Sequence, residues 1–208
     1  MALLTVRPTR LDQDVASTVV AHTNWPVESV AKTLTWGADE HVLIVAAAVG
    51  WLLTRGSQEN TRRLGTHFLA CSLCTALLPH ILKTLVDQKR PDRLTVEGHL
   101  HGVPFSGQPN DAFPSGHALH MGALASAATL LPSRWRNAAW SASLILVGTR
   151  VILLAHWLTD VVAGLAFGAA LERGLRYVTR PQPCRNATAN ERGSAMHRVA
   201  KKGSADRT

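Results

Sequence analysis

The chain has 208 residues, a length typical of one domain, and 46% of them are hydrophobic. Its net charge of +8 is concentrated at the C-terminal end, where eight Lys and Arg occur from Arg176 onward against Glu191 and Asp206. Because no basic stripe with interleaved aromatic residues runs through the rest of the chain, we expect no nucleic-acid partner.

The N-terminal segment has an amphipathic pattern. Arg7, Pro8 and Arg10 interrupt its opening apolar residues, so we expect no signal-peptide core there. Apolar residues then recur at helical spacing on both sides of Pro26, which predicts one or two amphipathic helices at the membrane interface or against the rest of the protein. These apolar positions are Leu11, Val15, Val19, Val27, Val30, Ala31 and Leu34.

Five apolar blocks follow, at residues 39–54, 64–86, 117–131, 138–155 and 157–175. A bilayer-spanning helix needs about 20 apolar residues. The second, fourth and fifth blocks reach this length, whereas the first and third are short enough to be buried core helices. Helices of a soluble all-α protein would show a polar face at every turn, and these blocks mostly lack one. We therefore predict an all-α fold, a polytopic membrane helix bundle with about five transmembrane helices.

The polar segments divide the chain and set its expected orientation. We expect an amphipathic N-terminal segment at residues 1–37, a membrane domain at 38–176 and a basic disordered tail at 177–208. Arginines lie on the connectors after the first and third blocks and in the tail, and five helices place these regions on one side. By the positive-inside rule that side is cytoplasmic. The connector at residues 87–116 and the link at His156 then face the other side.

Ionisable side chains inside apolar blocks are costly and indicate function. Lys83 and Arg90 are seven residues apart, which predicts one face of a helix that ends at the following proline. His156 and Asp160 are four apart, close enough on one helix face for the carboxylate to hold the ring, and Arg150 precedes them. A single Lys or Arg near the end of a span would be a snorkelling residue. Three cations beside two histidines and a buried carboxylate indicate instead a site for an anion with several oxygens, such as phosphate.

Three short motifs in the chain resemble those of a known family. They are KTLVDQKRP at residues 83–91, PSGH at 114–117 and RVILLAHWLTD at 150–160. In order and spacing they are similar to the K-x6-RP, PSGH and SR-x5-H-x3-D motifs of the type 2 phosphatidic acid phosphatase (PAP2) superfamily, and the resemblance covers roughly residues 40–175. Thr149 stands where that family usually has serine. The amphipathic N-terminal segment replaces the first of the family's usual six spans.

The resemblance implies a metal-independent phosphatase that works through a phosphohistidine. His156 is the implied nucleophile, and Asp160 would orient it by accepting a hydrogen bond from the ring. The alternative for Asp160 is a carboxylate that only suits a helix N-terminus. His117 is the implied general acid, preceded by Ser115 and Gly116 at a helix N-terminus that holds the anion. An ordinary helix cap at Ser115 with an interfacial His117 is the alternative.

The remaining charged residues complete the expected site. Lys83, Arg90 and Arg150 would clamp the phosphoryl oxygens and stabilise the charge of the transition state. No acidic cluster offers a magnesium site, so we expect no metal and no cofactor. We expect His99 and His101 to be solvated, and His67, His80 and His120 to be packed or hydrogen-bonded.

These inferences predict an integral-membrane enzyme whose partner is a membrane lipid phosphate. The substrate would be a phosphate monoester or diphosphate of the phosphatidic acid, phosphatidylglycerophosphate or undecaprenyl diphosphate type. The alternative is a non-catalytic membrane protein that binds or transports an anion in the same pocket. We expect a multi-pass protein, in a bacterial inner membrane, with its active site on the extracytoplasmic side. The sequence leaves the individual lipid and the oligomeric state open.

Overall fold

The computed structural model describes residues 4–91 and 112–183, and helices dominate both parts. Each of the five predicted apolar blocks forms a helix. In chain order the helices are α1 (Arg10–His22), α2 (Trp25–Leu34), η1 (Thr35–Ala38), α3 (Glu40–Leu53), α4 (Glu59–Leu85), α5 (Gly116–Ala127), η2 (Ala128–Leu130), α6 (Ser133–Ile152) and α7 (Leu158–Thr179), where η marks a 3-10 helix. One small departure from an all-α fold is a two-stranded parallel pair, β1 (Leu4–Thr5) with β2 (Val86–Asp87).

Side-chain caps explain where several of these helices begin. Thr9 and Asp12 form a reciprocal capping box at the start of α1. Asn24 caps α2 by accepting from the Val27 N–H, and Asp39 caps α3 through two backbone N–H groups. The N-terminal segment thus contains two α-helices, separated just before Pro26.

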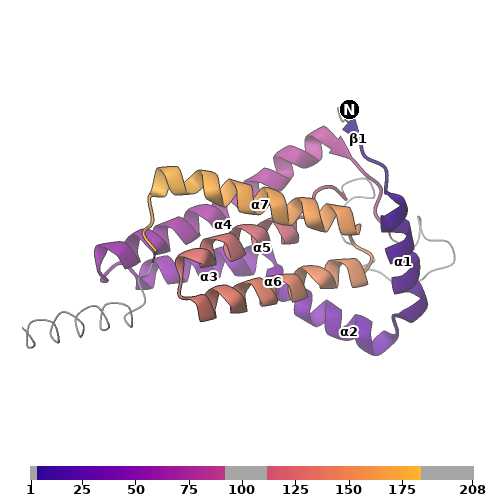
Figure 1. Ribbon diagram of the computed structural model, residues 1–208, viewed down its shortest axis with the longest axis horizontal. Helices are drawn as coiled ribbons and strands as arrows, with labels where there is room; N and C mark the ends of the chain where they lie inside the picture. The colour runs from indigo at the N-terminus through magenta and orange to yellow at the C-terminus, as the bar shows by residue number, and fades with distance from the viewer. Residues whose placement is uncertain (1–3, 92–111, 184–208) are drawn as a thin grey trace, which may run out of the picture.

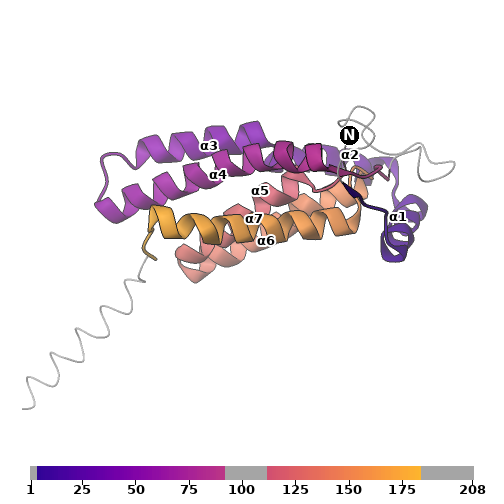
Figure 2. The same cartoon turned by 90° about the horizontal axis from the view of Figure 1, so that it is seen from above.

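The five helices α3 to α7 run side by side, and α5 lies at their centre. Figure 2 shows α5 between the α3–α4 pair and the α6–α7 pair. Nine of the twelve residues of α5 are buried, which accounts for the apolar composition of a helix too short to span a bilayer alone. Figure 1 shows α1 standing across one end of this bundle, the end that carries the link between α6 and α7.

Glycines allow α5 and α7 to pack with their backbones in contact. A Cβ at Gly168 would collide with the Leu119 carbonyl oxygen and lie 2.8 Å from the Ala123 nitrogen. A Cβ at Gly164 would lie 2.7 Å from the Ser115 carbonyl oxygen. These contacts fix the start of α5 against the start of α7, where two of the three motifs meet.

Gly168→Ala should therefore destabilise the bundle by about 1–3 kcal/mol, since neither backbone can move aside cheaply. The measurement is the thermal unfolding midpoint of the detergent-solubilised protein. Gly174→Ala on the same helix is the matched control, because a Cβ there meets nothing within 4 Å. Alanine is the better helix former, so this control should keep or raise the midpoint. Equal midpoints for the two variants would contradict the close packing.

A buried polar cluster joins α4, α5 and α7 at the opposite end of the bundle. The fully buried Glu172 receives hydrogen bonds from Ser126 Oγ (2.6 Å) and Arg176 Nε (2.5 Å), and His67 Nε2 lies 2.9 Å from its Oε1. His67 Nδ1 lies 2.7 Å from Thr179 Oγ1. The expectation that His67 is packed or hydrogen-bonded is confirmed.

Length and composition single out few membrane spans. Among the helices of residues 4–91 and 112–183, α4 alone is long and apolar enough to cross a bilayer. The stretch Trp25–Ala38 and α3 are together also long and apolar enough to cross a bilayer, with a bend of 41° between them. The count of five spans and the boundaries at residues 37 and 176 stay predictions, and most of the predicted tail (184–208) lies outside the described residues.

Candidate active site

A cavity of about 270 Å³ opens at the end of the bundle beside α1. It lies between the start of α3, the last turns of α4, the start of α5 and the link between α6 and α7. Six of the eight predicted site residues line it: Lys83, Arg90, Gly116, His117, Arg150 and His156. The other two are fully buried. Ser115 directly precedes Gly116, and Asp160 lies four residues after His156.

Lys83 and Arg90 reach this cavity from different elements, which corrects the sequence prediction. The helix α4 ends at Leu85, and the chain then forms β2 before Arg90. The two cations therefore do not share a helix face. Arg90 is 5% exposed, and its Nη1 donates to the Ala155 carbonyl (3.2 Å) in the link between α6 and α7.

The PSGH motif forms the start of α5, as predicted. Ser115 is the N-cap residue, and its Oγ accepts from the Ala118 N–H at 3.4 Å. The Ser115 N–H donates to the Asp160 carbonyl at 3.3 Å, which ties α5 to α7. A Cβ at Gly116 would make only ordinary contact with Pro79 Cγ, at 3.7 Å, so packing among the described residues does not require glycine there. Helix-terminal N–H groups at this point can hold an anion.

A residue of the N-terminal segment, Thr35, accepts a hydrogen bond from the Arg150 side chain. Arg150 lies in the last turn of α6 and is 7% exposed, and its Nη1 donates to Thr35 Oγ1 of η1 at 3.2 Å. Burial together with this bond limits the guanidinium to few orientations. It lines the cavity beside Arg90 and His156.

The link that carries His156 is strained and tightly bonded. Leu154 adopts φ 50°, the left-handed region that a leucine enters at a cost of about 1–3 kcal/mol. The N–H groups of Ala155 (3.0 Å) and His156 (3.3 Å) both donate to the Arg150 carbonyl. Leu154 is 1% exposed, so its packing holds the turn in place.

The His156 ring is oriented by a backbone carbonyl. Its Nδ1 lies 2.7 Å from the Ala112 oxygen, and since a carbonyl only accepts, Nδ1 carries the proton. A neutral ring then has a free lone pair on Nε2. Burial lowers the pKa of His156 well below its ordinary value, and the charges of Arg90 and Arg150 lower it further. The ring is therefore neutral and able to act as a nucleophile.

Asp160 does not hold the His156 ring directly, which corrects a second prediction. The distance from His156 Nδ1 to Asp160 Oδ2 is 3.8 Å, too long for a hydrogen bond. His156 precedes α7 instead of lying on it, and Asp160 Oδ2 accepts from the Trp157 N–H at 2.9 Å. Asp160 thus caps the N-terminus of α7, the alternative that its position in the chain had left open. This hydrogen bond fixes the backbone of Trp157, the residue that follows His156.

Other residues of the cavity wall were missed by the sequence analysis. They are Ala38, Asp39, Glu40, His41, Pro79 and His80. Two signals could have pointed to them: Asp39 is a helix-capping type just before an apolar run, and His80 lies three residues before Lys83, about one turn away on the same helix. His80 had been expected to be packed or hydrogen-bonded, but it is exposed and lines the cavity. His120 is buried and bonded to the Gly116 carbonyl (3.2 Å), as expected.

Within the described residues, no group of three or more His, Cys, Asp or Glu side chains could hold a metal ion. His99 and His101 lie outside the described residues. Three cations and a helix N-terminus thus line the same cavity as the imidazoles of His117 and His156, an arrangement that can bind a tetrahedral oxyanion and attack it.

The chain is similar to a known family and to several known proteins. The sequence profile of the PAP2 superfamily matches residues 64–184. A lipid A 1-phosphatase of Rhizobium johnstonii is 32% identical over 157 residues, which cover 69% of this chain and 64% of that protein. A lipid A 1-phosphatase of Rhizobium etli is 38% identical over 133 residues, covering 61% and 57% respectively. The chain therefore spans less than two thirds of the length of these relatives.

Two solved structures share the fold. LpxE of Aquifex aeolicus superposes with a TM-score of 0.60 at 14% identity, over 79% of this chain and 94% of that one. The first transmembrane PAP2-type phosphatidylglycerolphosphate phosphatase from Bacillus subtilis gives 0.57 at 19% identity, over 80% and 84%. At these identities the likeness establishes the arrangement of helices alone.

Proposed function

Because the chain belongs to the PAP2 superfamily, we propose that it is an integral-membrane phosphatase that removes phosphate from a lipid phosphate monoester or diphosphate. One observation carries the proposal: residues of three separate motifs line one cavity, and they include the three predicted cations and the two predicted catalytic histidines, His117 and His156. An anion-binding site needs the cations alone. A neutral, oriented imidazole beside them supports covalent chemistry.

The proposed reaction has two steps. The lone pair of His156 Nε2 attacks phosphorus, and the bond from phosphorus to the leaving oxygen breaks with its electron pair on that oxygen. His117 supplies the proton that this oxygen needs. Water then attacks the phosphohistidine and gives a proton to His117, which restores the acid. The phosphorus–nitrogen bond breaks with its electron pair on His156 Nε2, and inorganic phosphate leaves. Lys83, Arg90 and Arg150 stabilise the charge that develops on the phosphoryl oxygens in both steps.

A second cavity supports a lipid as the substrate. It has a volume of about 480 Å³ and lies between α3, α4 and α5, with a mainly apolar lining that includes Leu43, Ala47 and Phe68. Leu43 follows Glu40, a residue of the catalytic cavity wall, by about one helical turn. The lining suits an acyl chain whose phosphate end lies in the smaller cavity. Lipid A 1-phosphate, the substrate named for the two Rhizobium relatives, is the first lipid to test.

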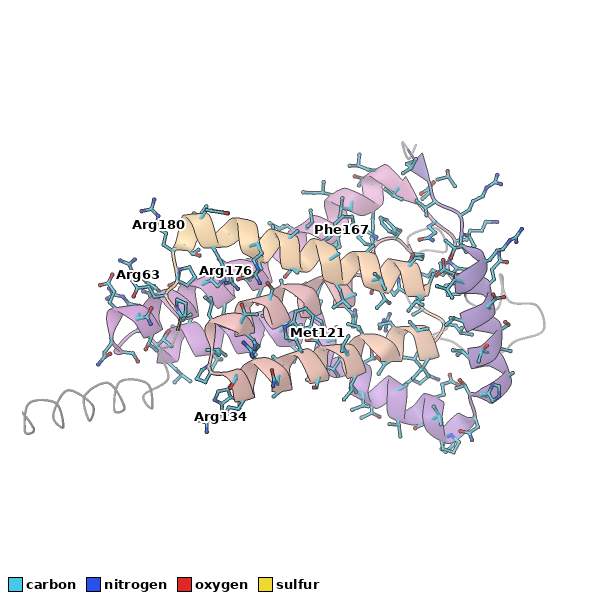
Figure 3. All side chains as sticks on the ribbon, in the orientation of Figure 1. Arg63, Met121, Arg134, Phe167, Arg176 and Arg180 are labelled. Atoms are coloured by element: carbon cyan, nitrogen blue, oxygen red, sulfur yellow. The ribbon has the colours of Figure 1, made fainter. Side chains whose placement is uncertain are left out.

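We place the active site on the extracytoplasmic side of a bacterial inner membrane, in a multi-pass protein with about five spans. Figure 3 shows Arg63, Arg134 and Arg180 at the end of the bundle opposite α1. The positive-inside rule makes that end cytoplasmic. Within the N-terminal segment, Trp25 (76%) and Trp36 (66%) are largely exposed, which supports contact with the membrane interface.

Single cysteines should reveal this orientation. In a background without Cys71, Cys74 and Cys184, we expect an impermeant thiol reagent to label Gln13→Cys on α1 in intact cells. Ser57→Cys, in the loop between α3 and α4, should react only after the cells are opened. Both positions are exposed, so a difference reflects the side of the membrane. The reverse labelling would invert the proposed orientation.

Phosphate release by the purified protein tests the function itself. We expect turnover in detergent with EDTA present, on at least one member of a panel containing lipid A 1-phosphate, phosphatidic acid, phosphatidylglycerophosphate and undecaprenyl diphosphate. Vanadate, which mimics the phosphoryl transition state, should inhibit it. Turnover that disappears with EDTA and returns with Mg²⁺ would contradict the mechanism. Binding of inorganic phosphate without release from any lipid would favour a non-catalytic anion-binding or transport protein.

A further inference from the structure

The helix α1 is bonded to the start of α7, directly beside the link that carries His156. Asp12 of α1 is 1% exposed although it is a carboxylate. Its Oδ1 accepts from the Thr159 N–H at 2.9 Å, and its Oδ2 accepts from the Thr159 hydroxyl at 2.8 Å. Thr159 is the second residue of α7, and 147 positions of sequence separate it from Asp12. A carboxylate from a distant helix thus satisfies one of the free N–H groups at the N-terminus of α7.

The Asp12 carboxylate accepts further hydrogen bonds within its own helix end. Thr9 donates to Oδ2 through both its backbone N–H and its hydroxyl, each at 2.9 Å. Burial raises the pKa of Asp12, but the hydrogen bonds from Thr159 and Thr9 outweigh it and lower the pKa below its usual value. The side chain is therefore ionised, and it caps α1 and α7 at once.

Apolar packing from α1 reaches residues on both sides of His156 in the chain. Ala16 of α1 forms a buried cluster with Leu154 and Trp157, and Val19 and Val20 pack against it. Leu154 is the left-handed residue of the link, and Trp157 follows His156 directly. The Trp157 Nε1 also donates to the Lys89 carbonyl at 2.7 Å.

We propose that Asp12 is a positioning residue for His156: by holding Thr159, it fixes the start of α7 and the strained link before it, so that Nε2 stays aimed into the phosphate cavity. The inference rests on the proposed function, in which His156 is the nucleophile. Asp12 does not line the cavity, whereas the cations that bind the phosphoryl group do. Loss of Asp12 should therefore slow the chemical step and leave substrate binding almost unchanged. A misplacement of about 1 Å can cost about 10²-fold in rate.

Steady-state kinetics on the best lipid of the panel test the inference. Asp12→Ala should lower kcat by about 10–10²-fold with KM nearly unchanged. Asp14→Ala is the matched control, since Asp14 is exposed on the same helix two residues away, and it should keep the wild-type kcat. Thr159→Val removes the hydroxyl donor and should also lower kcat, while Thr159→Ser restores the donor and should restore kcat. In the Thr159→Val background, Asp12→Ala should cost less than in the wild type.

Each outcome decides for or against the inference. A folded Asp12→Ala variant with wild-type kcat overturns it and leaves the proposed function standing, as does a rise in KM that accounts for the whole loss. If Asp12→Ala does not fold, the two Thr159 variants decide: equal kcat for Thr159→Val and Thr159→Ser overturns the inference. A wild-type protein that releases phosphate from no lipid overturns the proposed function, and the inference with it.

Discussion

His156→Ala is expected to abolish phosphate release from every substrate in the panel. His156 Nε2 is the proposed nucleophile, and an alanine leaves no group that can form the covalent intermediate. Its side chain is 3% exposed and lines the cavity together with Arg90 and Arg150, so water in the variant would have to attack without an oriented base. The measurement is inorganic phosphate released per enzyme, followed long enough to detect a decrease of about 10⁴-fold or more.

A trapped intermediate identifies the nucleophile directly. Acid-sensitive phosphate should be found on His156 after rapid quenching of turnover with a labelled substrate, and it should be missing from the His156→Ala variant. His22→Ala is the control, because His22 is an exposed histidine on α1 away from the cavity, and it should keep both activity and adduct. Label on another residue, or turnover by folded His156→Ala above the uncatalysed rate, would contradict the assignment.

The sequence was sufficient to predict that the three motifs meet, because each motif is short and lies at or near a helix end. Ser115 is a typical N-cap residue directly before an apolar run, so the sequence indicates that a helix begins there, and α5 does. Arg150 ends α6, and His156 follows within a tight link. Helices that alternate in direction bring such ends to one side of a bundle. The shared location of His117 and His156 could therefore be predicted from the sequence.

The details that failed depend on contacts between distant segments. Spacing suggested a helix from Lys83 to Arg90, but Val86 and Asp87 pair with Leu4 and Thr5 from the other end of the chain. A β-branched residue such as Val86 favours the strand conformation, but no local sequence pattern indicates which distant segment it will pair with. The spacing of His156 and Asp160 likewise suggested one helix face, but α7 begins at Leu158, so His156 lies in the link before it. Its ring then bonds to the Ala112 carbonyl in place of Asp160.

The contacts of the N-terminal segment also could not be predicted from the sequence. Its helical spacing predicted α1 and α2, yet nothing in that spacing distinguishes a helix on a membrane surface from one that braces a catalytic link. Thr35 bonds Arg150, and Asp12 bonds Thr159, and neither partner could be chosen from the sequence. Sequence alone would assign Asp12 only to its local capping box with Thr9.

His117→Ala should lower activity selectively, according to how much the leaving group needs a proton. His117 is the second residue of α5 and lines the same cavity as His156, which supports its proposed role as the donor to the leaving oxygen. General acid catalysis contributes about 10²–10⁴-fold, and its benefit shrinks as the leaving group becomes a weaker base. On a lipid phosphate, whose leaving group is an alcohol, kcat should therefore fall by about 10²–10⁴-fold. On p-nitrophenyl phosphate, whose leaving group is stable as an anion, much of the rate should return.

The ratio of the two losses is the quantity to measure, since it separates proton donation from general damage to the site. A variant that weakens phosphate binding, such as Lys83→Ala, should slow both substrates to a similar extent because both present the same phosphoryl oxygens. His117→Ala should instead still form the adduct on His156 from p-nitrophenyl phosphate. Equal losses on both substrates, or adduct formation that requires His117 even with this leaving group, would show that His117 is not the acid. The small distance in sequence between Ser115 and His117 would then reflect helix capping alone.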